Sequence, residues 1–392
     1  MISNSILNRF KKHWKGPGAK LVVGKKEVRI GQGEIKTTVT FKNPSIVRSL
    51  MILPSLAFGE AYMRGDITIE GDMMQFLQGF VQSTTLVPRI IRQIRKALLY
   101  IPISIPKAVK NAQHHYDIGN DFYSLWLDPS KTYTCAYFLQ ESDSLAAAQY
   151  QKIDLVCKKI RLQAGMTMLD IGCGWGGALF HAAQRYDVVV TGVTPAKEQA
   201  AYIVEQAKKL RLEDRVRVIV ADYRKLPELD KNTKYDRIIS IGMFEQVGKA
   251  QLAEFFTIWK RMLKDDGISL LHTIGRTNEE DTGRDPWLEK YIFPGGYIPL
   301  LREIMRDAGK EQLKVVDVEN LWQHYARTLN HWARNVEDKK EEVVNMFDEQ
   351  FFRMWMLYLK SCEAGFRWGD LHLYQTVMLG KDATWPLNRE VL

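Results

Sequence analysis

Residues 166–177, MTMLDIGCGWGG, constrain the fold more than any other part of this chain. An apolar run that contains one acid, Asp170, leads into a cluster of glycines, and a helical pattern follows. Glycine adopts backbone torsions and close approaches that other residues cannot, and free N–H groups at a helix start attract negative groups. The stretch therefore predicts a buried strand, a ligand-binding glycine loop and a helix. This arrangement is typical of nucleotide-cofactor sites in open α/β sheets.

Apolar strand patterns alternate with helical patterns beyond this loop. Such alternation predicts an α/β fold with a mostly parallel, doubly wound sheet. The expected strands are 166–171, 187–193, 215–221, 236–241 and 267–274, and the expected helices are 177–186, 196–211 and 249–264.

The N-terminal region has a different pattern. Residues 19–42 alternate as strands do, and helical and strand-like stretches follow to about residue 82. They predict a smaller α+β domain, after which Pro102 and Pro106 begin a linker. We expect a domain boundary at this linker, with one domain at 1–105 and a larger one at 106–392.

Positive charge is concentrated in the same region. Residues 1–110 hold 18 Lys and Arg against 6 Asp and Glu, a net +12, so the remainder must carry −3 to give the chain's +9. A local basic excess predicts an anionic partner, either lipid or nucleic acid. Residues 87–110 interleave basic and aliphatic side chains, which suits a membrane interface, although a helix packed on its own domain has the same pattern. Because no zinc-finger or RNA-binding signature accompanies the charge, we expect lipid and no nucleic acid.

Other features bound the location. No run approaches 18 apolar residues, and the first residues lack the core of a signal peptide. The four cysteines show no disulfide or zinc spacing, which favours a reducing cytosol. His114 and His115 diverge from each other on either a strand or a helix, so we expect no metal site there. The expected location is cytoplasmic, at the inner face of a membrane.

The glycine spacing alone does not name the cofactor. Gly172, Gly174 and Gly177 satisfy the dinucleotide pattern G-x-G-x-x-G. That fold normally places an acid at the end of the second strand, yet residues 192–194 supply none. Asp222 and Tyr223 instead follow the third expected strand, where they could recognise and cover an adenine. Together with D-x-G-x-G, this resembles S-adenosylmethionine (SAM)-dependent methyltransferases more than NAD enzymes.

Six segments sharpen that resemblance. They are HHYDIGNDFY (114–123), YTCAYF (133–138), LDIGCGWGG (169–177), GVTPAKEQ (192–199), GMFEQVG (242–248) and FPGGYIP (293–299). In this order they closely resemble the cyclopropane-fatty-acid-phospholipid synthase family, which includes the mycolic acid cyclopropane synthases. The resemblance covers about residues 110–392, with small departures at Thr134 and Pro195. It implies a class I SAM-dependent methyltransferase fold with a Rossmann-like sheet, and the basic region looks like the extra domain of members that act on whole phospholipids. The expected assignment is therefore a basic N-terminal lipid-binding domain at 1–105 and a SAM-dependent catalytic domain at 106–392.

The resemblance implies a set of cofactor contacts. Three loop glycines would approach the methionine part of SAM, and Asp170 would organise the loop or reach the amino group through water. Other positions match contacts beside the base site, at the ribose and at the adenine. The complete expected set is Tyr133, Thr134, Asp170, Gly172, Gly174, Gly176, Thr194, Gln199, Asp222, Tyr223 and Arg224.

The family also implies a bicarbonate ion as catalytic base. Glu245 and His272 fall near the ends of expected parallel strands, where ligands bind in such sheets. Cys135 and Tyr325 match the other side chains of the base site, and Ile274 matches a residue that contributes through its backbone. Cys362 matches a cysteine to which a nucleophilic role was once assigned; we favour a buried structural thiol and keep Cys362 as a candidate active-site residue.

The implied reaction transfers a methylene group from SAM to cis double bonds of phospholipid acyl chains, through a carbocation that bound bicarbonate deprotonates. Some of the aromatic residues after position 285 would line an acyl channel. The expected partners are unsaturated phospholipids, an anionic membrane surface and a second copy of the chain in a homodimer. The alternatives are a methyltransferase that makes methyl-, hydroxy- or methoxy-branched lipids, a small-amine methyltransferase, and a non-catalytic lipid-binding module.

Overall fold

The computed structural model describes residues 8, 11–50, 53–83, 99–116, 118–279 and 284–387. Their backbone forms two compact units. The first is Met1–Leu98 with Glu280–Pro294 and Ala326–Leu371, and the second is Leu99–Glu279 with Gly295–Tyr325 and His372–Leu392. The lipid-binding role expected for residues 1–105 stays a prediction. The first unit contains most of these residues and also two later segments of the chain. Half of the basic stretch 87–110, residues 87–98, lies outside the described residues.

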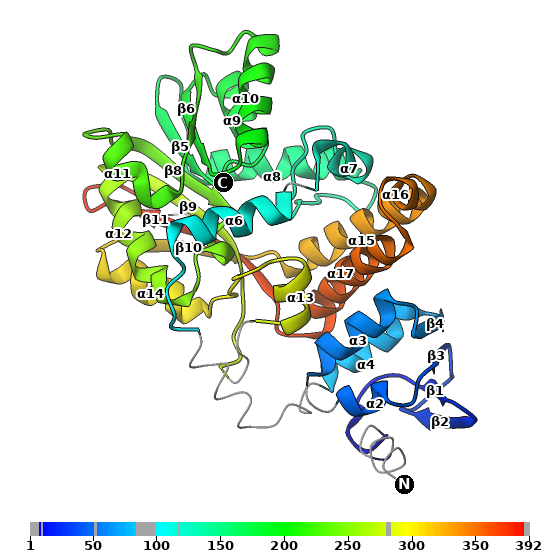
Figure 1. Ribbon diagram of the computed structural model, residues 1–392. Helices are drawn as coiled ribbons and strands as arrows, with labels where there is room; N and C mark the ends of the chain where they lie inside the picture. The colour runs from blue at the N-terminus through cyan, green and yellow to red at the C-terminus, as the bar shows by residue number, and fades with distance from the viewer. Residues whose placement is uncertain are drawn as a thin grey trace. The chain divides into compact units, whose positions relative to one another are not determined.

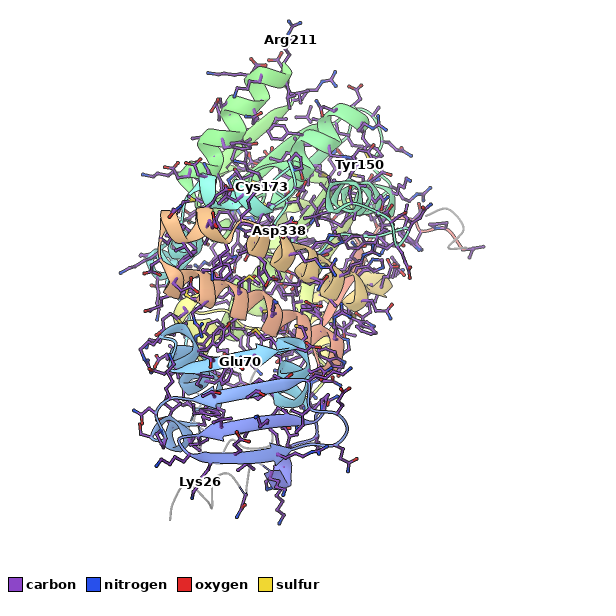
Figure 2. All side chains as sticks on the ribbon, turned by 90° about the vertical axis from the view of Figure 1, so that its right-hand side faces the viewer. Lys26, Glu70, Tyr150, Cys173, Arg211 and Asp338 are labelled. Atoms are coloured by element: carbon purple, nitrogen blue, oxygen red, sulfur yellow. The ribbon has the colours of Figure 1, made fainter. Side chains whose placement is uncertain are left out.

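A four-stranded sheet forms the N-terminal part of the first unit, in the order β2-β1-β3-β4. Alternate residues of β1 and β3 are buried, as the sequence pattern requires. Figure 2 shows the strands side by side, with Lys26 on one edge strand and Glu70 on the other. The strands are β1 (Ala19–Val23), β2 (Lys26–Ile30), β3 (Thr37–Phe41) and β4 (Ile67–Gly71).

Helices complete the first unit and confirm its α+β character. The long helix α17 packs against α3 and α4, and α13 packs against α3. Phe76 stacks on Trp14 and on Phe58, with ring centroids 5.4 and 5.5 Å apart. The helices are α2 (Ile46–Ser49), α3 (Pro54–Met63), α4 (Met73–Gln82), α13 (Pro286–Tyr291), α16 (Lys340–Met346), α17 (Glu349–Trp368) and, from Ala326, the larger part of α15 (Trp322–Asp338).

The second unit contains a seven-stranded sheet in the order β10-β11-β9-β8-β5-β6-β7. Strands β5 to β9 are parallel to their neighbours among themselves, and β11 runs antiparallel to both β9 and β10. This mostly parallel, Rossmann-like sheet confirms the predicted fold class. The strands are β5 (Thr167–Ile171), β6 (Val189–Thr194), β7 (Val216–Val220), β8 (Tyr235–Ile241), β9 (Leu263–Gly275), β10 (Lys314–Asn320) and β11 (His372–Leu379).

Helices cover both faces of this sheet (Figure 1). Adjacent residues of β5 show the two sides: Met168 packs with α8, α9 and α10, whereas Leu169 packs with α11, α12 and α14. These helices are α8 (Leu145–Lys159), α9 (Gly177–Arg185), α10 (Lys197–Leu210), α11 (Leu226–Leu229), α12 (Leu252–Met262) and α14 (Leu301–Lys310), and the unit also holds α6 (Ile105–Tyr116) and α7 (Asn120–Trp126). Among the described residues, no helix has the length and apolar character needed to cross a membrane.

Candidate active site

The glycine loop follows β5 and has a conformation that requires glycine. Gly172 has φ 88°, and a Cβ atom there would lie 2.4 Å from the Cβ atom of Met243. Gly174 also has a positive φ, and no atom within 4 Å would meet its Cβ. The indole Nε1 of Trp175 donates to Asn120 Oδ1 at 2.8 Å, which ties the loop to α7. The loop backbone is therefore fixed while one side stays open to a ligand.

A hollow of about 1300 Å³, open solvent included, lies at the carboxyl ends of β5, β6, β7 and β8. Ten of the eleven expected cofactor residues line it, in keeping with the position of ligand sites in open α/β sheets. Gly176 is the exception, because it is the N-cap of α9 and its Cα faces Ile203 and Phe180. Gly177 lines the hollow, and the expectation that Gly176 approaches the cofactor stays a prediction.

Asp222 is held rigidly at one end of the hollow. The Arg224 guanidinium donates to both carboxylate oxygens, at 2.8 Å from Nε and 2.7 Å from Nη2, and both side chains are buried. Arg224 also donates from Nη1 to the carbonyl of Ile103 at 2.7 Å. Arg224 therefore acts by fixing the orientation of Asp222, whose remaining lone pairs can accept hydrogen bonds from a ligand.

Thr194 and Gln199 form a second polar pair in the hollow. The Thr194 hydroxyl donates to Gln199 Oε1 at 2.7 Å. This leaves Gln199 Nε2, a buried donor, without a partner in the described part of the chain. A buried amide without a partner is unfavourable, so this group is suited to a ligand hydroxyl such as that of a ribose.

Asp170 and Lys152 are two buried ionisable residues beside the glycine loop. Asp170 is 3% exposed, and its Oδ1 atom has no partner among the residues described. Burial raises the pKa of Asp170 to about 7 and lowers the pKa of Lys152 to about 8. Lys152 donates to Thr134 Oγ1 at 2.9 Å. A cationic amino group from a ligand would satisfy the orphaned Asp170 oxygen.

Glu245 lies in a short 3₁₀ helix, Phe244–Gln246, that follows β8. Its Oε1 atom accepts a hydrogen bond from the backbone N–H of Ile274 at 2.6 Å. Its Oε2 atom is buried, and no described group bonds to it. Burial raises the pKa of Glu245, against the effect of the Ile274 N–H. The backbone N–H of Ile274 thus holds the Glu245 carboxylate, and its expected contribution to the base site stays a prediction.

His272 lies in β9 and is fully buried. Its Nδ1 atom is 3.2 Å from the side-chain amide nitrogen of Gln375, and its Nε2 atom has no partner among the described residues. Burial, helped by Lys152 and Lys159, holds the pKa of His272 well below its usual value. The imidazole is therefore neutral near pH 7.

Backbone contacts bring the other expected base-site residues to the same region. The Cys135 sulfur lies 3.9 Å from the carbonyl oxygen of Leu321, which also accepts from the N–H of Tyr325 at 3.1 Å. The N–H of Leu321 in turn donates to the carbonyl of Leu373 at 2.7 Å, and Leu373 pairs with Ile274 across β11 and β9. Cys135, Tyr325 and Ile274 are thus linked through two residues.

Cys362 has a different setting. It lies on α17 in the first unit, whereas the other expected catalytic residues lie in the second. Burial raises the pKa of the Cys362 thiol to about 12, so the nucleophilic thiolate is scarce at neutral pH. This favours the interpretation of Cys362 as a structural thiol.

Sequence reasoning missed three buried polar residues of the second unit. Lys152 and Lys159 are two helical turns apart on α8, and Gln375 lies in β11 between Tyr374 and Thr376. The sequence of β11 mixes polar and apolar residues, so it gives no clear signal for a buried glutamine. Among the described residues, no three His, Cys, Asp or Glu side chains are grouped as metal ligands would be.

Comparisons with known proteins agree with this geometry. Residues 104–376 match the family model described as mycolic acid cyclopropane synthetase, and residues 23–87 match a domain of unknown function. The chain belongs to the mycolic acid cyclopropane synthetase family. Membership confirms the resemblance drawn from the six segments, and with the fold it makes the chain an enzyme of the SAM-dependent methyltransferase class.

Individual relatives extend the similarity. The chain is 36% identical to a cyclopropane-fatty-acyl-phospholipid synthase of Escherichia coli over 351 residues, which is 88% of each chain. It is 33% identical to a "probable fatty acid methyltransferase" of Pseudomonas putida, over 87% of this chain and 86% of that protein. A crystal structure of a mycolic acid cyclopropane synthase complexed with SAH and CTAB has a TM-score of 0.65 at 35% identity, and covers 69% of this chain and 98% of its own.

Proposed function

We propose that this enzyme is a cyclopropane-fatty-acyl-phospholipid synthase whose site holds bicarbonate as the base. The observation that carries the proposal is a pair of buried atoms of opposite hydrogen-bonding character. Glu245 Oε2 can accept a hydrogen bond and His272 Nε2 can donate one in the tautomer with its proton there, and neither atom has a partner in the described part of the chain. Bicarbonate has one O–H group and acceptor oxygens, so it could satisfy both atoms at once.

SAM fits the neighbouring hollow on similar grounds. The Asp170 oxygen can accept from its amino group, the Gln199 amide can donate to a ribose hydroxyl, and Asp222 is fixed for the adenine. When bound, SAM supplies an electrophilic methyl group, and bicarbonate supplies the base that removes a proton from that group as the ring closes.

The chain's own residues would do three things. They would align the methyl group with the alkene carbon, because an isolated double bond is a weak nucleophile. They would exclude water, which would trap the carbocation on the former alkene as an alcohol. Glu245 would accept the bicarbonate proton, which makes the remaining oxygens more basic, and His272 would donate to one of them.

The similarity to the E. coli enzyme supports a phospholipid substrate. Its 88% coverage reaches well into the residues that precede the family match at 104–376. In the first unit, the side chains of several lysines are exposed, which suits an anionic surface. They include Lys11, Lys12, Lys15, Lys25, Lys36 and Lys42. The proposal therefore includes peripheral association with the inner face of a membrane, no nucleic-acid partner, and a homodimer as in the resembling family.

A second candidate is a methyltransferase that leaves a methyl, hydroxyl or methoxy branch on the same carbon. The P. putida relative favours it, and it differs only in how the carbocation is quenched. The orphaned, buried Glu245 and His272 atoms favour ring closure, because they offer a place for a base. They also disfavour a non-catalytic lipid-binding module, in which such groups would have no use.

One assay separates these functions. Purified protein is incubated with SAM and vesicles of phosphatidylglycerol that carries one cis double bond per acyl chain, and the acyl chains are analysed by mass spectrometry. The proposal expects a gain of CH₂ with loss of the alkene. A gain of CH₂ with the alkene kept, or of CH₃ and OH together, would establish the branched-lipid alternative, and no gain at all would contradict both.

The docking role is tested by matched charge reversals. The double variant Lys25→Glu with Lys42→Glu changes exposed residues of the first unit, and Lys197→Glu with Lys208→Glu makes the same change on α10 of the second. Only the first pair should weaken sedimentation with phosphatidylglycerol vesicles, by about 1 kcal/mol per lysine at low salt. Equal losses in both pairs would show an effect of net charge rather than a docking surface.

A further inference from the structure

A row of polar side chains crosses the sheet of the second unit on the face covered by α8. Glu319 of β10 is directly opposite Gln375 of β11, and Gln375 is directly opposite His272 of β9. Residues directly opposite each other in paired strands share a face of the sheet. Around them this face is apolar, with Leu270 and Val377 packed among residues of α8. Polar side chains in such a layer are unfavourable unless they are paired.

Lys159, at the C-terminal end of α8, bonds to this row. Its Nζ atom donates to Gln375 Oε1 at 2.8 Å and to Glu319 Oε2, and lies 3.8 Å from Asp317 Oδ2. Its side chain is 3% exposed. An ammonium group can only donate, so the Gln375 atom that faces it must be the carbonyl oxygen. Lys159 therefore fixes which way the Gln375 amide points.

The orientation of Gln375 determines the protonation of His272. With Oε1 on Lys159, the NH₂ group of Gln375 faces His272 Nδ1 at 3.2 Å. An NH₂ group also only donates, so Nδ1 must accept and carry no proton. A neutral imidazole has one N–H, which is then at Nε2. The opposite tautomer would set two N–H groups against each other.

We propose that Lys159, acting through Gln375, is a positioning residue that fixes His272 as the neutral tautomer with its proton on Nε2. This tautomer presents a hydrogen-bond donor to the anion, a last step that rests on the proposed function. The reversed tautomer would present a lone pair to the anion, and an imidazolium would neutralise the base. The tautomer itself follows from the contacts of Lys159, Gln375 and His272, whatever the substrate.

Nitrogen-15 spectra of the full-length protein with labelled histidine report the tautomer directly. A ring nitrogen without a proton resonates far downfield of one with a proton, and His272→Asn identifies the signals. In the unaltered protein, Nδ1 of His272 should be the unprotonated atom. Gln375→Glu keeps the shape and the contact to Lys159 but presents only acceptors, so it should invert the pattern. Lys159→Met should give mixed tautomers.

Matched controls separate this relay from a general effect on folding. Lys158→Met removes the neighbouring lysine, which is 57% exposed and pairs with Asp154, and should change neither spectrum nor rate. Lys159→Arg keeps a cationic donor and should retain the Nε2–H pattern. An unchanged pattern in Gln375→Glu, or in Lys159→Met, would overturn the proposal.

Kinetics test the link to the reaction. Gln375→Glu should lower kcat by about 100-fold, the effect of losing one oriented donor to an oxyanion, with the KM for SAM little changed. Lys159→Arg should recover most of the rate lost in Lys159→Met. If the tautomer inverts while kcat holds, the relay stands and the role of His272 toward an anion fails. If the tautomer responds as expected but the protein makes no cyclopropane, the relay stands and the proposed function fails.

Discussion

The residues that line the hollow (the cofactor half) and the residues around Glu245 and His272 (the base half) are held in place differently. The cofactor half comes largely from loops that follow β5, β6 and β7, and two of its polar pairs lie within five residues of each other, Asp222 with Arg224 and Thr194 with Gln199. The base half joins residues far apart in the chain, such as Glu245 with Ile274 and His272 with Gln375. Contacts within single loops thus orient these two pairs of the cofactor half, whereas the base half depends on partners from distant parts of the chain.

The electrostatics of the two halves differ in the same way. Burial brings the pKa of Asp170 to about 7, so its charge changes near neutral pH. In the base half, burial holds His272 neutral, with its pKa well below the usual value. Binding should therefore respond to pH near neutrality, while the state of His272 should not.

The largest effect is expected from Glu245→Gln. This variant keeps an acceptor for the Ile274 N–H but cannot take up a proton, so kcat should fall by about 1000-fold, within the range for acid–base residues. Isothermal titration should show SAM affinity nearly unchanged. Equal losses of kcat and SAM affinity would mean that Glu245 supports the cofactor half, which would contradict the assignment of separate roles to the two halves.

Asp170→Asn should have the opposite signature. Removing the charge that faces a cationic amino group should weaken SAM binding by roughly 10- to 100-fold, as for a charge-assisted hydrogen bond. At saturating SAM, kcat should change little. A large loss of kcat with unchanged affinity would place Asp170 in the base half.

The titration of Asp170 should also make the stability of the enzyme depend on pH. The pKa of Asp170 is raised from 3.8 to about 7, so between these values the folded protein holds a proton that the unfolded chain has lost. Stability therefore falls as pH rises through that window. Asp170→Asn removes the penalty and should stabilise the SAM-free enzyme above pH 7 by on the order of a few kcal/mol. In the unaltered enzyme, SAM affinity should rise as pH passes about 7, and thermal melts and titrations at several pH values check both slopes.

Arg224→Lys tests a smaller contribution to binding. Lysine cannot form the two parallel hydrogen bonds that hold Asp222, so the KM for SAM should rise by roughly 3- to 10-fold with kcat unchanged. Arg217→Lys is the matched control, because Arg217 makes a single bond to Asp230 and its side chain is 57% exposed. Similar shifts in both variants would argue against a special role for Arg224.

The sequence predicts the cofactor half better than it predicts the long-range contacts of the base half. The strands of the cofactor half fall within about two residues of their predicted ranges, because apolar runs end in glycine or charge. Glycine spacing does not show which glycine lines the hollow and which, like Gly176, faces Ile203 at a helix start. Lys159 and Gln375 are 216 residues apart, and a lysine in a helical pattern reads as solvated. The first unit likewise recruits 326–371, whose helical pattern does not reveal its partner.

Thr134 lies where the halves meet and should give the smallest and least selective effect. It lines the hollow, and its hydroxyl accepts from Lys152, whose charge also influences His272. Thr134→Val keeps the shape but removes that acceptor, which should lower stability by about 1–3 kcal/mol. Because Lys152 then loses its anchor, KM for SAM and kcat should both change, by less than Asp170→Asn and Glu245→Gln change either. Thr134→Ser keeps the hydroxyl and should behave as the unaltered enzyme. A change in KM for SAM alone would assign Thr134 to the cofactor half, and a change in kcat alone would assign it to the base half.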